Sequence, residues 1–314
     1  MMADTLLLAD VGGTYSRIGL AHDRTLDQTS MRTIRNADFS GLAAVLKAYL
    51  DALQPNPPRA FCAGVAGPVR AGAAQLTNLD WFLDPCVLSR ETGISEVSLI
   101  NDLQAQGYAL DDLAPATVTL LVKGARAGPD AVRMVFGMGT GCNIAVVHKT
   151  PGGLFVPPAE SGHSSLPFVT GKLRHLFEHL GRDAPHLPIE AVLSGPGLGR
   201  IYTWMSGENR TPSEIIAAHE DGNALAYEAL QFFGQVLGQT LGNLALNHLP
   251  MGGVYLIGGL ARAIAPHLDR IGFLENFTAR GPYQNILQDI PVYLIDDDNT
   301  ALRGCARYMW QQLD

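Results

Sequence analysis

The chain has 314 residues, enough for one large domain or two of ordinary size, and its 47% hydrophobic content suits a soluble protein with a substantial core. The formal net charge of −8 offers no basic surface for nucleic acid or for an anionic membrane. No apolar run approaches membrane-spanning length, and the first residues, MMADTLLLAD, lack the basic start of a signal peptide. We therefore expect a cytoplasmic protein that binds neither nucleic acid nor a membrane.

The cysteines are scattered, and none of them forms a C-x-x-C pair. This spacing indicates neither a zinc site nor a redox pair. Each cysteine stands among small or apolar residues, so we expect buried free thiols in a reducing compartment at Cys62, Cys86, Cys142 and Cys305.

The stretch from Leu6 to Leu20, LLLADVGGTYSRIGL, predicts two strands joined by a tight turn. Gly12 and Gly13 lack a Cβ atom, so the backbone can approach a ligand closely, and the amides with the Thr14 hydroxyl suit phosphate oxygens. Asp10, at the end of the first strand, is a candidate for Mg²⁺ bound through water. An ordinary hairpin with a capping Asp explains this segment alone equally well.

The remainder of the first third predicts a mixed sheet with crossover helices. Helical spacing runs from Asp38 to Leu53, with Ser40 as the expected N-cap and an end before Pro55. Further along the chain we expect strand 59–66, helix 84–92, strand 97–100 and helix 103–110.

A second series of strands repeats the opening pattern. Strands 117–122 and 132–136 lead to the turn Gly137-Met138-Gly139-Thr140-Gly141, and strand 143–148 follows. A strand, a glycine turn that carries a Thr and a second strand therefore occur twice. This repetition suggests two related halves, although one sequence does not demonstrate a duplication.

The second half becomes helical. Gly195-Pro196-Gly197 is interpreted as a stop signal, and Thr211 to Glu214 forms a capping box with Pro at the first helical position. Glycines 234, 238 and 242 share one face of an expected helix or helix pair over 222–249, which indicates close packing. The other expected elements are helices 171–180 and 198–205, strand 254–257 with a helix after Gly258-Gly259, strand 292–295 and helix 300–312.

Several of these places are candidates for chemistry. Asn101 and Asp102 follow strand 97–100 at its carboxyl end, where ligands bind in open α/β sheets, and Asp102 suits a general base. A helix N-cap is the better explanation of this pair taken alone. Glu160 and His163 in the loop PAESGH suit the vicinal hydroxyls of a sugar, as does Glu190, while a surface loop with a capping Glu is the alternative.

Phosphates and a nucleoside have candidate sites in the second half. The turn Gly139-Thr140-Gly141 could bind the distal phosphates, and Gly258-Gly259 could admit a flat nucleoside. No G-x-x-x-x-G-K-[ST] motif occurs, so a P-loop enzyme is excluded, and no G-x-G-x-x-G opens a βαβ unit.

The order of these motifs resembles the actin/hexokinase/Hsp70 ATPase superfamily and, within it, bacterial-type glucokinases of the non-zinc group. The matching segments run over nearly the whole chain: LLLADVGGTYSRIGLA, LTNLDW, LINDLQAQGYAL, GMGTGCNIAVV, PAESGHSSLPF, EAVLSGPGLGRIY, GNLALN, VYLIGGLARAI and IPVYLIDDDNTALRG. The chain departs from the family at Tyr15, Met138, Cys142-Asn143, the AESGH loop and Leu79-Asp80.

The resemblance implies a two-domain actin-like (ribonuclease H-like) α/β fold with a ligand cleft between a small domain, 1–112 plus 297–314, and a large domain, 113–296. It implies ATP-dependent phosphorylation of glucose at the 6-hydroxyl with Mg²⁺ and a homodimer. Asn101, Asp102, Glu160, His163 and Glu190 would hold the sugar, and Asp102 would be the base. The alternatives are a same-fold kinase for another hexose or amino sugar, and a sugar-binding regulator without transfer activity.

Overall fold

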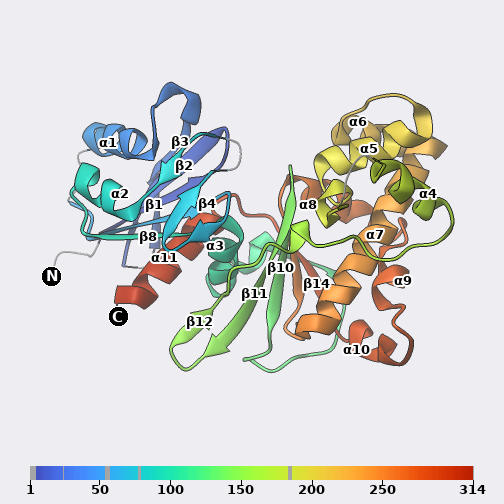
Figure 1. The fold of residues 1–314 in the computed structure, drawn as a ribbon. Coiled ribbons are helices and arrows are strands. Elements are labelled where there is room, and N and C mark those ends of the chain that lie inside the picture. The colour runs from blue at the N-terminus through green and yellow to red at the C-terminus, as the bar shows by residue number, and fades with distance from the viewer. Residues whose placement is uncertain (1–4, 24, 54–56, 77–78, 183–185, 314) are drawn as a thin grey trace. The chain divides into compact units, whose positions relative to one another are not determined.

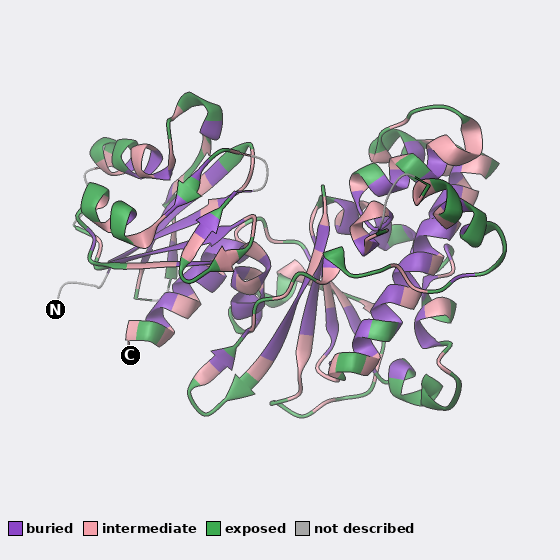
Figure 2. Cartoon of the chain, in the orientation of Figure 1, coloured by how far each residue is buried: buried purple, intermediate pink, exposed green. Residues whose placement is uncertain are grey.

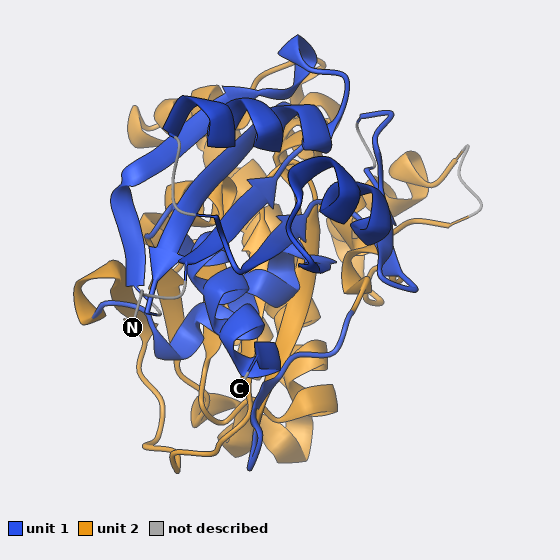
Figure 3. Cartoon of the chain, turned by 90° about the vertical axis from the view of Figure 1, so that its left-hand side faces the viewer, with its two compact units in different colours: residues 1–114, 150–158, 297–314 blue, residues 115–149, 159–296 orange. Residues whose placement is uncertain are grey.

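The computed structural model describes residues 5–23, 25–53, 57–76, 79–182 and 186–313 (Figure 1). By their internal contacts these residues divide into unit 1, within 1–114, 150–158 and 297–314, and unit 2, within 115–149 and 159–296 (Figure 3). Both units are α/β, as predicted. The domain boundaries given above stay a prediction.

Unit 1 is built on a sheet with the strand order β3-β2-β1-β4-β8. β1 pairs antiparallel with β2 and parallel with β4, and β4 pairs parallel with β8, so the predicted hairpin and the predicted mixed sheet are confirmed. The strands are β1 (Thr5–Val11), β2 (Tyr15–His22), β3 (Thr25–Arg35), β4 (Ala60–Val65) and β8 (Glu96–Asn101).

Helices cover both faces of the central strand β1. Leu7, Ala9 and Val11 pack in a core with residues of α1 and α2, while α11 also contacts β1 and β4. Coverage of both faces explains why this strand is a continuous apolar run and why its residues are buried (Figure 2). The helices are α1 (Leu42–Leu53), α2 (Pro85–Thr92), α3 (Asp102–Tyr108) and α11 (Thr300–Leu313); the short strands are β5 (Val69–Arg70), β6 (Ala73–Gln75), β7 (Phe82–Leu83) and β12 (Gly153–Phe155).

In unit 1 two expectations are corrected, and one strand was not predicted. α1 begins at Leu42, so the residue directly before the helix is Gly41, and the expected N-cap Ser40 lies one residue further away. β3 was not predicted, because it buries only Leu26 and Ser30 and carries no regular apolar alternation. Cys86 is exposed, whereas Cys62, Cys142 and Cys305 are buried as free thiols.

Within their sheet, the strands of unit 2 have the order β11-β10-β13-β14-β9, with β10 antiparallel to β11 and parallel to β13. Its strands are β9 (Val118–Val122), β10 (Arg133–Met138), β11 (Cys142–Thr150), β13 (Val254–Ile257) and β14 (Val292–Ile295). Its helices are α4 (Gly171–Leu180), α5 (Gly195–Ser206), α6 (Pro212–Glu220), α7 (Ala224–His248), α8 (Gly259–Ile264), α9 (Phe273–Thr278) and α10 (Gln284–Gln288).

The start of α5 corrects the expected stop signal. Gly195 to Gly197 form the first turn of α5, because Ser194 is the N-cap and its hydroxyl accepts a hydrogen bond from the Gly197 amide at 3.0 Å. Pro196 tolerates this place because the first amides of a helix have no partner within the helix.

The predicted close packing along the expected long helix is confirmed. α7 is one helix of 25 residues, and a Cβ atom at Gly238 would collide with the backbone of Phe273 in α9. Among the described residues, no helix combines the length and the apolar character needed to cross a membrane.

Candidate active site

The first glycine turn, residues 12–14, joins β1 to β2 and is held by a buried asparagine. The Gly12 amide donates to the Tyr15 carbonyl at 3.1 Å. The Asn36 side chain donates to the Gly12 carbonyl at 2.7 Å and accepts from the Ser16 hydroxyl at 2.8 Å. Asn36 therefore fixes the turn from a position 24 residues away, and nothing in the local sequence pattern indicates this role.

Asp10 lies at the end of β1, and its cross-strand neighbour in β2 is Arg17. Burial raises the pKa of the Asp10 carboxyl to about 6, and the positive charge of Arg17 opposes this effect without cancelling it. A desolvated carboxylate gains from a cation nearby, and Mg²⁺ commonly takes one or two carboxylates while keeping several waters. Asp10 therefore fits the predicted magnesium ligand.

Asn101 and Asp102 stand at the carboxyl end of β8. Asn101 is buried and is the N-cap of α3. Its side-chain oxygen accepts from the Leu103 backbone amide at 2.9 Å, and its backbone amide donates to the Gln104 side-chain oxygen at 3.1 Å. The capping interpretation is thus confirmed for Asn101. Asp102, half-buried, is the first residue of α3, and its carboxylate accepts from the Leu103 amide at 2.9 Å.

The second glycine turn, residues 139–141, joins β10 to β11 in unit 2. The Gly139 amide donates to the Gly141 carbonyl at 2.9 Å, and the Gly139 carbonyl accepts from the Gly195 amide at 2.8 Å, which ties the turn to α5. Gly258, between β13 and α8, has a φ of 106°, and a Cβ atom there would collide with the Met138 backbone. Only glycine suits this close approach.

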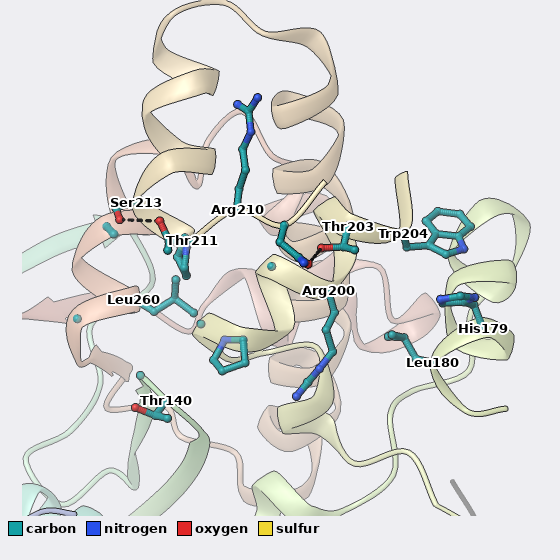
Figure 4. A pocket seen from close by; sticks show the side chains of 18 residues that line it. Thr140, His179, Leu180, Arg200, Thr203, Trp204, Arg210, Thr211, Ser213 and Leu260 are labelled. Carbon is teal, nitrogen blue, oxygen red and sulfur yellow. Dashed lines mark hydrogen bonds between the residues drawn. The ribbon is translucent and has the colours of Figure 1, made fainter. Parts of the chain in front are cut away.

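A cavity of about 1120 Å³ opens beside this second turn (Figure 4). α5, α6 and α8 form its walls together with Gly139 and Thr140, and Gly259 at the start of α8 also lines it. Among the described residues that line it none is acidic, whereas Arg200 and Arg210 are basic. Its volume and its basic side chains suit a nucleotide, and Arg210 also pairs with Glu208 at 3.0 Å.

Glu160, His163 and Glu190 lie together in unit 2, and their role in holding a sugar stays a prediction. Glu160 precedes the 3₁₀ turn Ser161–His163, and Glu190 lies in the 3₁₀ turn Ile189–Ala191. His163 Nδ1 is 3.6 Å from Glu190 Oε1. Desolvation raises the pKa of Glu160, the His163 charge lowers it, and the Glu190 charge raises it further.

The second glycine turn lies close to the Glu190 carboxylate. A Cβ atom at Gly141 would lie 2.8 Å from Glu190 Oε2, so the second turn and the sugar cluster share one small volume. The Ser194 hydroxyl donates to the Glu190 carbonyl at 2.7 Å and thereby joins this residue to the N-cap of α5.

The predicted site residues thus fall into two sets. Unit 1 contains Asp10, Gly12, Gly13, Thr14, Asn101 and Asp102, and unit 2 contains Gly139, Thr140, Gly141, Glu160, His163, Glu190, Gly258 and Gly259. In the segment LTNLDW, residues 77 and 78 lie outside the described residues. The roles of all these residues stay predictions.

Each unit joins an antiparallel hairpin with a glycine turn to parallel strands and crossover helices, which is the two-domain actin-like ATPase architecture of sugar kinases. A family model described as "Glucokinase" matches residues 7–312. The chain belongs to the glucokinase family.

Relatives match it over nearly their full length. A glucokinase of Nostoc punctiforme is 32% identical, over 96% of this chain and 98% of that protein. A glucokinase-like protein of Xylella fastidiosa is also 32% identical, over 97% of this chain and 94% of that protein. The crystal structure of a glucokinase from an Antarctic psychrotroph superposes with a TM-score of 0.85 at 29% identity, covering 98% of this chain and 99% of that one.

Proposed function

We propose that this protein transfers the γ-phosphoryl group of ATP to the 6-hydroxyl of glucose. The observation that carries the proposal is the glucokinase match over residues 7–312, which spans both units. The cavity beside Thr140, whose described lining includes Arg200 and Arg210 and no acidic residue, supports a nucleotide as the second substrate.

The two glycine turns are proposed to hold the phosphates. The other amides of the two turns, at residues 13–14 and 140–141, and the hydroxyls of Thr14 and Thr140 would face the transferring group and spread its negative charge. The Gly258-Gly259 segment would lie against the nucleoside. Such preorganised donors stabilise charge in the transition state without reorganising during the reaction. Mg²⁺, held near Asp10 through water, would supply further charge neutralisation when bound.

The sugar is proposed to bind to Asn101, Asp102, Glu160, His163 and Glu190. Carboxylates accept hydrogen bonds from hydroxyls, and an amide or imidazole both donates and accepts, so this set suits a polyhydroxy ligand. Asp102 would take the proton of the 6-hydroxyl late in the transfer. A positioned base of this kind typically contributes about 10²–10⁴-fold in rate.

A coupled assay with ATP and a panel of hexoses and amino sugars tests the proposal. We expect turnover to be highest with glucose. A higher rate with mannose, fructose or an amino sugar would assign another acceptor to the same fold, and sugar binding without ADP formation would indicate a regulator. A homodimer and a cytoplasmic location also stay predictions.

A further inference from the structure

Asn143 is the second residue of β11 and lies two residues after Gly141, the last residue of the second glycine turn. Across the β10–β11 pairing its neighbour is Gly137. Because Gly137 has no side chain, the cross-strand neighbour leaves the Asn143 amide unobstructed, and this amide reaches the segment 159–161.

All four hydrogen-bonding positions of the Asn143 side chain are used. Nδ2 donates to the Ala159 carbonyl at 2.6 Å and to Glu160 Oε2 at 3.2 Å. Oδ1 accepts from the Ser161 amide at 2.9 Å and from the Ile144 amide at 2.8 Å. This network fixes the orientation of the amide, since a flipped side chain would set its oxygen against two acceptors.

Glu160 needs such support. Its side chain is exposed, and its backbone, with φ −129° and ψ 49°, has neither helical nor strand conformation. The Glu160 side chain does not cap the 3₁₀ turn that follows, so regular structure does not orient its carboxylate. Asn143 contacts Ala159, the Glu160 carboxylate and Ser161.

We propose that Asn143 is a positioning residue that sets the direction of the Glu160 carboxylate for a sugar hydroxyl. The inference rests on the proposed function, because it takes Glu160 as a sugar ligand. The neutral amide acts as a donor toward Glu160, so it holds the carboxylate without adding charge to the cluster.

Charged groups surround Glu160, so replacing the neutral Asn143 amide by a carboxylate tests whether this neutrality matters. His163 and Glu190 are the charged groups whose fields act on Glu160, and the His186 ring lies 2.7 Å from the His163 carbonyl. In Asn143→Asp the new carboxylate can still accept from Ser161 and Ile144. The new carboxylate would repel the Ala159 carbonyl oxygen and the Glu160 carboxylate, and this repulsion would end when one of the two carboxylates takes up a proton.

The experiment compares Asn143→Asp and Asn143→Ala with the wild type. Glucose affinity is measured by intrinsic fluorescence without ATP at pH 8 and pH 5.5, and the KM for ATP is measured separately. Loss of a hydrogen bond to a charged group corresponds to about tenfold in affinity. We expect Asn143→Asp to weaken glucose binding about tenfold at pH 8 and to recover most of this loss at pH 5.5. Asn143→Ala should weaken it at both pH values, and the KM for ATP should change less than about twofold.

Asn276→Asp is the matched control. Asn276 in α9 is half-buried like Asn143, and its side chain donates to the Gly272 carbonyl at 2.8 Å. We expect this variant to leave glucose affinity and its pH dependence unchanged. Equal losses of glucose and ATP affinity in the Asn143 variants, or the same pH dependence in Asn276→Asp, would overturn the positioning role.

Two further measurements separate this inference from the proposed function. In a Glu160→Ala background, Asn143→Ala should cause no further loss of glucose affinity, and an undiminished loss would contradict action through Glu160. In the sugar-free protein, the carboxyl titration of Glu160, followed by NMR, should move to higher pH in Asn143→Asp. If the wild type binds no hexose, the proposed function fails, but the titration still tests whether Asn143 acts on Glu160. A Glu160 titration that is the same in Asn143→Asp and in the wild type would overturn the inference.

Discussion

Replacing Asp10 by Asn should stabilise the ligand-free protein while abolishing its activity. Burial raises the pKa of Asp10 from its ordinary value of 3.8 to about 6. One pKa unit corresponds to about 1.4 kcal/mol, so ionisation of Asp10 costs the folded protein up to about 3 kcal/mol. Asn has nearly the same shape as Asp and carries no charge, so the folded variant does not bear the free-energy cost of ionisation.

The pH window follows from the direction of the change in pKa. Below about pH 4 the Asp10 carboxyl is protonated in both the folded and the unfolded chain, so the cost is absent. Between about pH 4 and pH 6 the folded protein retains a proton that the unfolded chain has released, so stability falls as the pH rises. Above about pH 6 the full cost applies.

The assay is urea unfolding of wild type and Asp10→Asn at pH 4.5 and pH 8, with a chelator and without nucleotide. The difference in unfolding free energy should favour the variant and grow by about 2 kcal/mol from pH 4.5 to pH 8. Adding Mg²⁺ and ATP should raise the stability of the wild type more than that of the variant.

Asp27→Asn is the matched control within the same sheet. Its pKa is lowered, chiefly by hydrogen bonds from Thr29, so this replacement should change stability in the opposite direction. An Asp10→Asn variant that is less stable than wild type at pH 8, or a stability difference that does not depend on pH, would refute the reasoning.

Three further predictions concern the site. Asp102→Asn should lower kcat by about 10²-fold or more while glucose binding changes little, because shape and hydrogen-bonding reach are kept; near-normal turnover would reduce Asp102 to a helix residue. Glu160→Ala and His163→Ala should each raise the KM for glucose by one to two decades, about 1.5–3 kcal/mol, and an increase confined to the KM for ATP would assign this loop to the nucleotide. Gly258→Ala should destabilise the fold by about 1–3 kcal/mol, because φ is 106° there and the Met138 backbone is close, whereas Gly259→Ala meets no atom within 4 Å; thermal unfolding of the pair should differ accordingly.

The sequence predicted the elements whose pattern arises within the element itself. α6 was identified from its capping box at Thr211, where the Thr211 side chain accepts from the Glu214 amide as expected. β3 escaped prediction because Ser30, one of its two buried residues, is polar and is satisfied by the Leu20 amide in the neighbouring strand at 2.9 Å. A hydrogen bond to a neighbouring strand leaves no hydrophobic pattern within the sequence of β3 itself.

The same distinction applies to the candidate site. Glycine turns are visible in a sequence because glycine is tied to a backbone requirement, as the contacts of Gly258 illustrate. Asn36 and Ser194 act through hydrogen bonds to residues in other turns, and their roles depend on contacts that the fold creates. The raised pKa of Asp10 likewise needs the burial that only the packed sheet provides.

The two units place different chemistry on one topology. In unit 1 the order β2-β1-β4-β8 corresponds to β11-β10-β13-β14 in unit 2, with the first pair antiparallel and the others parallel. Two residues before the first turn stands Asp10, paired with Arg17; two residues before the second stands Gly137, paired with Asn143. The first position thus offers a carboxylate that suits a cation, and the second offers space in which a neutral amide orients Glu160. A fold of this kind does not by itself assign a chemical role to either hairpin, and we expect these few side chains at equivalent places to do so.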